Sequence, residues 1–133
     1  MSSRSTKLPL RHVRGRDAEQ AAADWIAQRG FRVLWRNLRI GALELDLVAK
    51  KDDLVVIVEV RTRSAGSFEG ALASVSFTKQ RTMLRAARAL WRQYLSKMTE
   101  VRRVRIDVAA VTLGPIEPQI EWIAGAITEQ GRM

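Results

Sequence analysis

A chain of 133 residues, 47% of them apolar, can form one domain with its own core, and this composition excludes a disordered protein. The absence of cysteine excludes disulfide bonds and thiolate metal sites, and a single histidine excludes a histidine cluster. The net charge of +9 favours a polyanionic partner such as nucleic acid.

The first 16 residues carry five basic residues and no acidic one. We interpret 1–16 as a basic flexible arm ahead of a single domain at 17–133; an ordinary frayed terminus is an equal alternative. The arm lacks the apolar core of a secretory signal, and no apolar run in the chain reaches the roughly 18 residues of a membrane span. We therefore expect a cytoplasmic protein with no membrane partner.

The first predicted helix begins at Asp17, which can cap it together with Gln20 three residues later. Gly30 ends it. The following run, 31–36, is typical of a strand. The apolar stripe of this helix consists of Ala18, Ala21, Ala22, Trp25 and Ile26.

Residues 43–63 predict a β-hairpin with a polar turn at 50–53. In the second arm, six of the seven residues of 54–60 are aliphatic, as in a strand buried on both faces, yet this run contains Glu59. A buried carboxylate is costly unless it is paired or binds a metal.

The first arm of the hairpin places Glu44 and Asp46 on one face, because strand side chains alternate with period 2. Adjacent strands would aim Asp46 and Glu59 at a common point, with Arg61 on the same face as Glu59. Oxygen ligands suit a hard divalent cation, so the sequence predicts a metal site here.

A long loop at 64–76 lies beside this predicted site and leads to a second helix at about 77–97. The expected buried face of this helix consists of Met83, Ala87, Leu90 and Tyr94. Four arginines recur at helical spacing on nearly the opposite face, and we name them the arginine ridge: Arg81, Arg85, Arg88 and Arg92. Since residues 79–97 contain no acid, we favour a surface that tracks phosphates over an ordinary solvated face.

The last predicted elements are a strand at 104–113 and, after a break at 114–118, a short amphipathic helix at 120–128 anchored by Trp122. The first three strands can form a meander, and the fourth must join the sheet through a helical crossover. This order predicts an α/β fold: a three-layer sandwich in which a mixed central sheet of about four strands has helices on both faces.

Two further residue types have a structural and a functional interpretation. For Asp107 we favour a structural ion pair with Arg105 or Arg61 over a supporting role in the site. For the four tryptophans we favour packing over base stacking. Trp91 is the best stacking candidate because it is partly off the buried helix face.

Phosphodiester hydrolysis needs charge neutralisation at phosphorus and an activated water, and Mg²⁺ held by two carboxylates supplies both. Asp46, Glu59 and Arg61 suit the roles of two ligands and a charge-stabilising cation. Structural salt bridges between strands give the same pattern, so spacing alone leaves both interpretations open.

Several motifs in this order resemble the YraN family of small bacterial proteins, over residues 15 to about 128. The most specific are the Glu-x-Asp-Leu motif at 44–47 and the Val-Glu-Val-basic-x-Arg motif at 58–63. The others lie at 15–19, 36–39, 79–81, 105–108 and 122–123. The resemblance implies a restriction-endonuclease-like fold of the PD-(D/E)XK nuclease superfamily, similar to that of Holliday junction resolvases.

The resemblance also implies roles for individual residues. Asp46 matches the acid of the "PD" half, and Glu59 with Arg61 matches the "(D/E)XK" half. The Val60 carbonyl would be a further metal ligand. The remaining matches are Glu19, an acid brought to the site by the first helix; Glu44, which binds metal or positions its partner; and Lys79, a basic residue that starts the second long helix and faces the site.

The chain departs from the superfamily at Arg61, where the signature residue is lysine. Arginine stays charged and cannot act as a general base. We therefore expect a nucleic-acid-binding protein, with DNA favoured, and leave its enzymatic activity open. It is either an Mg²⁺- or Mn²⁺-dependent endonuclease, with branched DNA among its candidate substrates, or a non-catalytic binding module or RNA or protein assembly factor.

The expected nucleic-acid contacts come from the strand that carries Glu59 and from the second long helix. A homodimer is left open, because junction resolvases of similar size act as dimers. The expected contact residues are Arg63, Lys79, Arg81, Arg85, Arg88 and Arg92.

Overall fold

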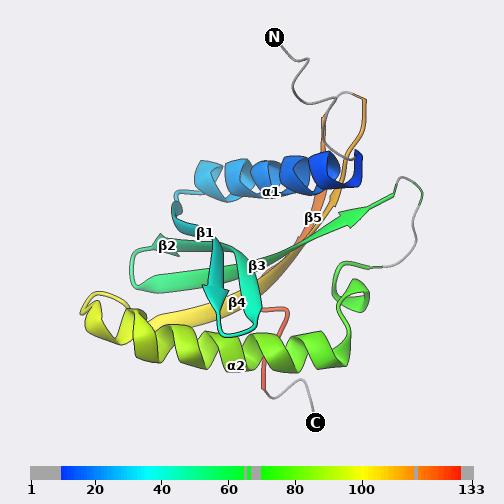
Figure 1. Ribbon diagram of the computed structural model, residues 1–133. Coiled ribbons are helices and arrows are strands. Elements are labelled where there is room, and N and C mark those ends of the chain that lie inside the picture. The colour runs from blue at the N-terminus through cyan, green and yellow to red at the C-terminus, as the bar shows by residue number, and fades with distance from the viewer. Residues whose placement is uncertain (1–9, 65, 67–69, 116, 130–133) are drawn as a thin grey trace.

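A computed structural model of the protein shows a five-stranded sheet between two helices (Figure 1). It describes residues 10–64, 66, 70–115 and 117–129, with side chains from Asp17 onward. The elements are α1 Leu10–Gln28, β1 Arg32–Ile40, β2 Leu43–Lys51, β3 Leu54–Arg63, η2 Leu72–Ser74, α2 Phe77–Gln93, η3 Leu95–Lys97, β4 Arg103–Thr112 and β5 Gln119–Ile123, where η denotes a 3₁₀ helix.

The strands lie in the order β1-β2-β3-β4-β5. Only the central pair β3–β4 is parallel, and α2 makes the crossover that a parallel connection requires. The other three pairs are antiparallel, so the sheet is mixed. The predicted α/β sandwich with helices on both faces is confirmed, with five strands instead of about four.

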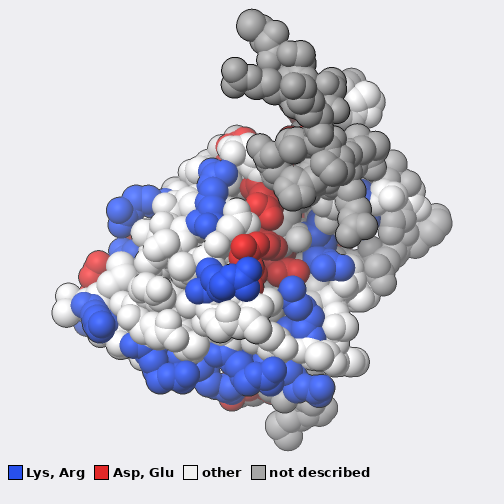
Figure 2. Space-filling view, in the orientation of Figure 1, with Lys and Arg blue, Asp and Glu red and all other residues white. Residues whose placement is uncertain are grey.

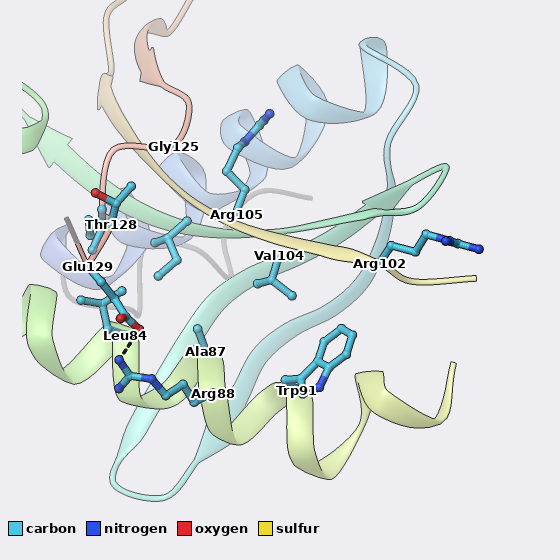
Figure 3. A pocket seen from close by; sticks show the side chains of 12 residues that line it. Leu84, Ala87, Arg88, Trp91, Arg102, Val104, Arg105, Gly125, Thr128 and Glu129 are labelled. Atoms are coloured by element: carbon cyan, nitrogen blue, oxygen red, sulfur yellow. Dashed lines mark hydrogen bonds and ion pairs between the residues drawn. The ribbon is translucent and has the colours of Figure 1, made fainter. Parts of the chain in front are cut away.

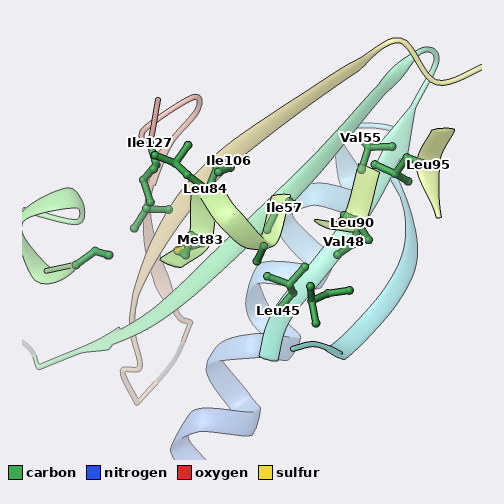
Figure 4. Close-up of a cluster of buried hydrophobic side chains, with 14 of the residues drawn as sticks. Leu45, Val48, Val55, Ile57, Met83, Leu84, Leu90, Leu95, Ile106 and Ile127 are labelled. Atoms are coloured by element: carbon green, nitrogen blue, oxygen red, sulfur yellow. The ribbon is translucent and has the colours of Figure 1, made fainter. Parts of the chain in front are cut away.

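Each helix covers one face of the sheet. In β3 the aliphatic side chains alternate: Val56 and Val58 pack in the cluster under α1, whereas Val55 and Ile57 pack in the cluster under α2 (Figure 4). Both faces of β3 are therefore buried from solvent, as its continuous aliphatic run predicts. By the same alternation, Glu59 belongs to the α2 face.

The predicted hairpin is confirmed, and its turn is the two-residue Asp52–Asp53. Asp52 has a φ of 54°, a left-handed conformation in which aspartate is several-fold enriched. The β2–β3 ladder runs from Lys51 opposite Leu54 to Leu47 opposite Val58. The two strands part beyond that pair, and this opening positions the acidic residues described below.

The start of α1 differs from the prediction. The helix begins at Leu10, so Asp17 lies inside it and the predicted Asp17 cap is wrong. A cap motif predicts a start only where the preceding residues do not continue the helix. Of the predicted basic arm, 10–16 belong to α1, and 1–9 lie outside the described residues.

Helix α2 matches its prediction at the start and differs at the end. Ser76 caps it, and the chain leaves the α-helix after Gln93 to form η3. Met83 and Leu90 are buried as expected. Tyr94 is exposed rather than buried, because the helix has ended before it, and its ring packs against Trp35 at 5.3 Å between centroids.

The predicted helix at 120–128 is wrong, because Gln119–Ile123 forms β5 and pairs with β4. The five residues alternate with period 2. Ile120 and Trp122 pack in the α1-side cluster, whereas the Glu121 carboxylate is bonded to Arg63 and to the Ala71 amide. The segment is too short for its hydrophobic pattern to distinguish a strand from a helix. It forms a strand because β4 has a free edge with which it can pair.

Asp107 is fully buried and ties β4 to the segment that follows β5. Its carboxylate accepts hydrogen bonds from Arg105, from the Trp122 indole at 2.8 Å and from the Gly125 amide at 2.8 Å. The structure thus bears out the structural ion pair with Arg105. Trp122 is also stacked on Trp25, with centroids 4.1 Å apart, which fixes α1 over β5.

No helix in the described part of the chain combines the length and the apolar character that a membrane crossing needs. The cytoplasmic location stays a prediction.

Candidate active site

Asp46 lies at the point where β2 and β3 part. Its carboxylate accepts a hydrogen bond of 2.8 Å from the backbone amide of Val60. This N–H follows the last backbone pair of the ladder, Leu47 opposite Val58, and the carboxylate takes the place of a backbone acceptor. The side chain of Asp46 is therefore fixed against β3, as the strand pattern predicts.

Glu59 is buried beside Asp46, with 6% of its side chain exposed. The two carboxyl groups share a hydrogen bond. Burial, followed by the charge of Asp46, raises the pKa of Glu59 to about 7, although Lys79 and Arg61 act in the opposite direction. Burial also raises the pKa of Asp46, against the hydrogen bond from Val60. Glu59 therefore carries the proton of the pair below about pH 7 and releases it above that pH.

Two cations face the same oxygen of Glu59. Arg61 Nη1 lies 3.6 Å and Lys79 Nζ 3.7 Å from Oε2. Both distances exceed those of a hydrogen bond, so these are charge contacts. Arg61 thus does not form two parallel hydrogen bonds with Glu59. Both cations are partly exposed, so a phosphate can reach them.

The position of Lys79 follows from the way α2 begins. Ser76 adopts an extended conformation, and its hydroxyl accepts a hydrogen bond from the Lys79 amide at 3.1 Å. The cap fixes the first turn next to the end of β3. Lys79 therefore faces the carboxylate pair from α2, as the resemblance implies.

Helix α1 contributes Glu19 from the other side. Burial, followed by the charge of Asp46, raises the pKa of Glu19, and a hydrogen bond with Asn37 acts against this. Asn37 lies on β1 with a φ of 54°, a conformation that asparagine tolerates better than most residues. Asn37 falls in the motif at 36–39, which indicates the family but assigns this residue no role in the site.

The remaining predicted residues of this region have different surroundings. Glu44 is exposed on β2, and its charge raises the pKa of both Asp46 and Glu19. Val60 contributes its amide to Asp46, and a role for its carbonyl stays a prediction. Arg63 forms an ion pair with Glu121 at 2.7 Å, so contact with a phosphate would compete with this pair.

The arginine ridge is exposed along α2. All four of its arginines lie at the surface, and Figure 2 shows a row of basic side chains over this helix. Arg88 forms an ion pair with Glu129, a carboxylate far away in the sequence. Glu129 lies outside residues 79–97, so the absence of acidic residues in that segment does not reveal the pair. Because of this pair, Arg88 is the least available of the four arginines for contact with a phosphate.

Acidic side chains also reach the surface near the carboxylate pair. Figure 2 shows acidic side chains gathered in the middle of one face, between α1 and α2, with lysine and arginine on several sides. No group of three or more carboxylates or imidazoles within the described ranges is arranged as a complete metal cage. Two carboxylates match Mg²⁺, which often takes one or two carboxylates together with waters and substrate phosphates.

This arrangement defines an α/β domain with a paired-carboxylate site and a basic helix. A family model described as uncharacterised protein family UPF0102 matches residues 18–111, and the chain belongs to this family, which confirms the YraN resemblance. A UPF0102 protein of Sorangium cellulosum is 40% identical over 117 residues, covering 87% of this chain and 81% of that protein. One of Methylococcus capsulatus is 40% identical over 120 residues, covering 90% and 94%.

Among solved structures, the chain is similar to Pyrococcus furiosus SfsA in complex with Ca²⁺. The sequence identity is 16% and the TM-score is 0.40, with 85% of this chain covered. The chain spans 62% of the length of that structure.

The raised pKa of Glu59 predicts a stability cost that depends on pH. Between its ordinary pKa of 4.5 and about 7, the folded protein holds a proton that the unfolded chain has released, so wild-type stability falls as pH rises through this window. Glu59→Gln removes this dependence. The variant should match wild type at pH 5 and gain on the order of 1–3 kcal/mol over it at pH 8.

Urea unfolding in EDTA at both pH values measures this difference. The control is Glu44→Gln, which makes the same chemical change at an exposed position near Asp46. A gain at pH 8 no larger for Glu59→Gln than for Glu44→Gln would contradict the buried, protonated carboxyl.

Proposed function

We propose that the protein is a metal-dependent nuclease of the PD-(D/E)XK type that acts on DNA. The observation that carries the proposal is the Asp46–Glu59 pair: a half-buried and a buried carboxyl group from adjacent strands, hydrogen-bonded to each other, with two cations 3.6–3.7 Å from Glu59. Carboxylates with raised pKa values in contact with specific charges are typical of functional sites.

Asp46 and Glu59 would hold Mg²⁺ or Mn²⁺ in their ionised forms. When bound, the ion supplies charge neutralisation and an activated water. The carboxylate pair must release its shared proton to bind the ion, so activity should rise from pH 6 to pH 8. The Val60 amide keeps Asp46 oriented while this proton leaves.

Arg61 and Lys79 divide the role that one lysine has in the superfamily signature. Arg61 remains charged and is suited to hold a non-bridging phosphate oxygen. Lys79 brings its ammonium group to 3.7 Å from Glu59, and lysine is the residue type of the superfamily signature. We therefore assign to Lys79 the place of the signature lysine beside the carboxylate pair.

Exposed cations outside the site favour nucleic acid as substrate. The net charge is +9, and the exposed arginine ridge begins two residues after Lys79. A duplex that lies along α2 would place a phosphate at the carboxylate pair while the ridge contacts others. DNA as the substrate and a homodimer as the active form belong to the proposal.

A non-catalytic binding module is the second candidate, and one observation favours it. Arg61 and Lys79 already neutralise Glu59 without any added ion. A site whose carboxylate charge is already neutralised could bind a phosphate group without cleaving it. The two candidates differ in whether the phosphodiester bond is cleaved.

Cleavage of linear, flapped and four-way DNA in Mg²⁺ or Mn²⁺ tests the proposal. Wild type should cleave at least one of these substrates. Asp46→Asn should slow cleavage on the order of 100-fold or more, the scale on which removal of one electrostatic group acts in an active site. DNA binding in EDTA should remain.

The matched control is Asp52→Asn, the same chemical change at the far end of the hairpin, where asparagine tolerates the left-handed φ of 54°. It should cleave like wild type. Binding without cleavage by wild type on all three substrates, with either ion, would reject the nuclease in favour of the binding module.

The arginine ridge predicts a particular salt dependence of DNA binding. Single changes of Arg81, Arg85 or Arg92 to Gln should each lower the slope of log K against log salt by about 1, because each removes one phosphate contact. Arg88→Gln should have a smaller effect, because Glu129 already pairs with Arg88.

Titrations at several salt concentrations measure these slopes. Arg103→Gln is the control: this exposed arginine pairs with Asp53 and lies outside the ridge. Slopes equal to that of wild type in all the ridge variants would show that the ridge meets something other than a phosphate backbone.

A further inference from the structure

A groove lies between the second half of α2 and the first half of β4, away from the carboxylate pair (Figure 3). It exists because β5 pairs only with residues 108–112 of β4, so the earlier part of β4 lacks this neighbour. The segment 125–129 closes one end, where Arg88 and Glu129 form their ion pair. The volume is about 480 Å³, within the range of pockets that bind small ligands.

Trp91 lies at the other end of this groove, which we name the Trp91 groove. Its side chain projects from α2 into the space in front of Val104 (Figure 3). Trp25 is stacked on Trp122 and Trp35 packs on Tyr94, but Trp91 has no ring partner in the described part of the chain and is 37% exposed. An exposed indole with one free face is a stacking platform.

The floor of the Trp91 groove is apolar. Leu84 and Ala87 of α2 face Val104 and Ile106 of β4 across it. The small side chain of Ala87 leaves space beside Trp91. A flat aromatic ring fits these surroundings, because it can lie against the indole and remove apolar surface from water.

The rim of the groove is basic. Arg102 lines the same end of the groove as Trp91, with its side chain pointing outward (Figure 3), and its guanidinium has no ion-pair partner among the residues that the structure describes. Arg88 lines the groove and also belongs to the arginine ridge, so the ridge runs along the opening of the groove. Glu129 adds one carboxylate, which can accept a hydrogen bond from an exocyclic amine.

We propose that the Trp91 groove binds one unpaired base of a single-stranded nucleic acid, with Trp91 as the stacking platform and Arg102 and the ridge on the flanking phosphates. The inference rests on the proposed function only in taking nucleic acid as the ligand, and it does not require cleavage. Trp91 lies twelve residues after Lys79, about 18 Å along the helix axis. Duplex that ends in a single strand would therefore engage the site and the groove together.

Fluorescence anisotropy of labelled 12-mers in EDTA tests the proposal, with single-stranded DNA, single-stranded RNA and duplex DNA as probes. Trp91→Ala should weaken binding of at least one single strand about 10- to 100-fold and leave the duplex unchanged, since stacking on one aromatic residue contributes about 1–3 kcal/mol. Trp91→Phe should retain most of the affinity. Ala87→Phe, which fills the groove and keeps Trp91, should reproduce the loss.

Phe77→Ala is the control: it removes an aromatic residue that is 72% exposed on the same helix, outside the groove, and should have no effect. Thermal melting shows that each variant is folded. The same binding series is repeated in the Asp46→Asn background, in which the proposed nuclease site is disabled. A loss of single-strand binding with Trp91→Ala in this background supports the groove even if the protein proves not to be a nuclease.

Three results would overturn the proposal. The first is wild-type single-strand affinity in both Trp91→Ala and Ala87→Phe. The second is an equal loss of duplex binding, which would show that the effect is not specific to an unpaired base. The third is displacement of the single strand by polyglutamate as effectively as by an unlabelled oligonucleotide of equal charge, which would point to an acidic chain as the occupant.

Discussion

The buried contact between Glu59 and Asp46 is the constraint on which the functional arrangement depends. Two carboxylates at this depth would repel each other and lose hydration, so the fold has to compensate them. The Val60 amide, a shared proton and the charges of Lys79 and Arg61 provide this compensation. The capped first turn of α2 contributes to this compensation, because it places Lys79 beside the two carboxyl groups. A divalent ion together with a substrate phosphate would compensate the carboxylate charges instead.

Helix α2 serves four purposes because a helix presents different faces to different surroundings. Its buried face, which includes Met83 and Leu90, completes the core, and its first turn holds Lys79 at the carboxylates. Its outer face is the arginine ridge, and its second half lines the Trp91 groove. One rigid element thus links the proposed chemistry to two proposed binding surfaces. Their spacing is set by helical geometry, not by flexible loops.

The sequence predicts what local periodicity determines. The hairpin, the buried acid in an aliphatic run and the crossover helix all follow from patterns within about twenty residues. The contacts that depend on distant pairing do not. Gln119–Ile123 became a strand because β4 offered an edge, Arg88 met Glu129 across 41 residues, and Asn37 reached Glu19 through a left-handed residue in β1. The Trp91 groove arises from the short length of β5, which no single segment reveals.

A crystal structure soaked in Mn²⁺ at pH 8 tests the central claim most directly, because the anomalous signal of manganese locates the ion independently of activity. The account predicts one Mn²⁺ between the carboxylates of Asp46 and Glu59, with Lys79 displaced from Glu59. An anomalous map at saturating Mn²⁺ with no peak at these carboxylates, and with Lys79 still 3.7 Å from Glu59, would contradict it.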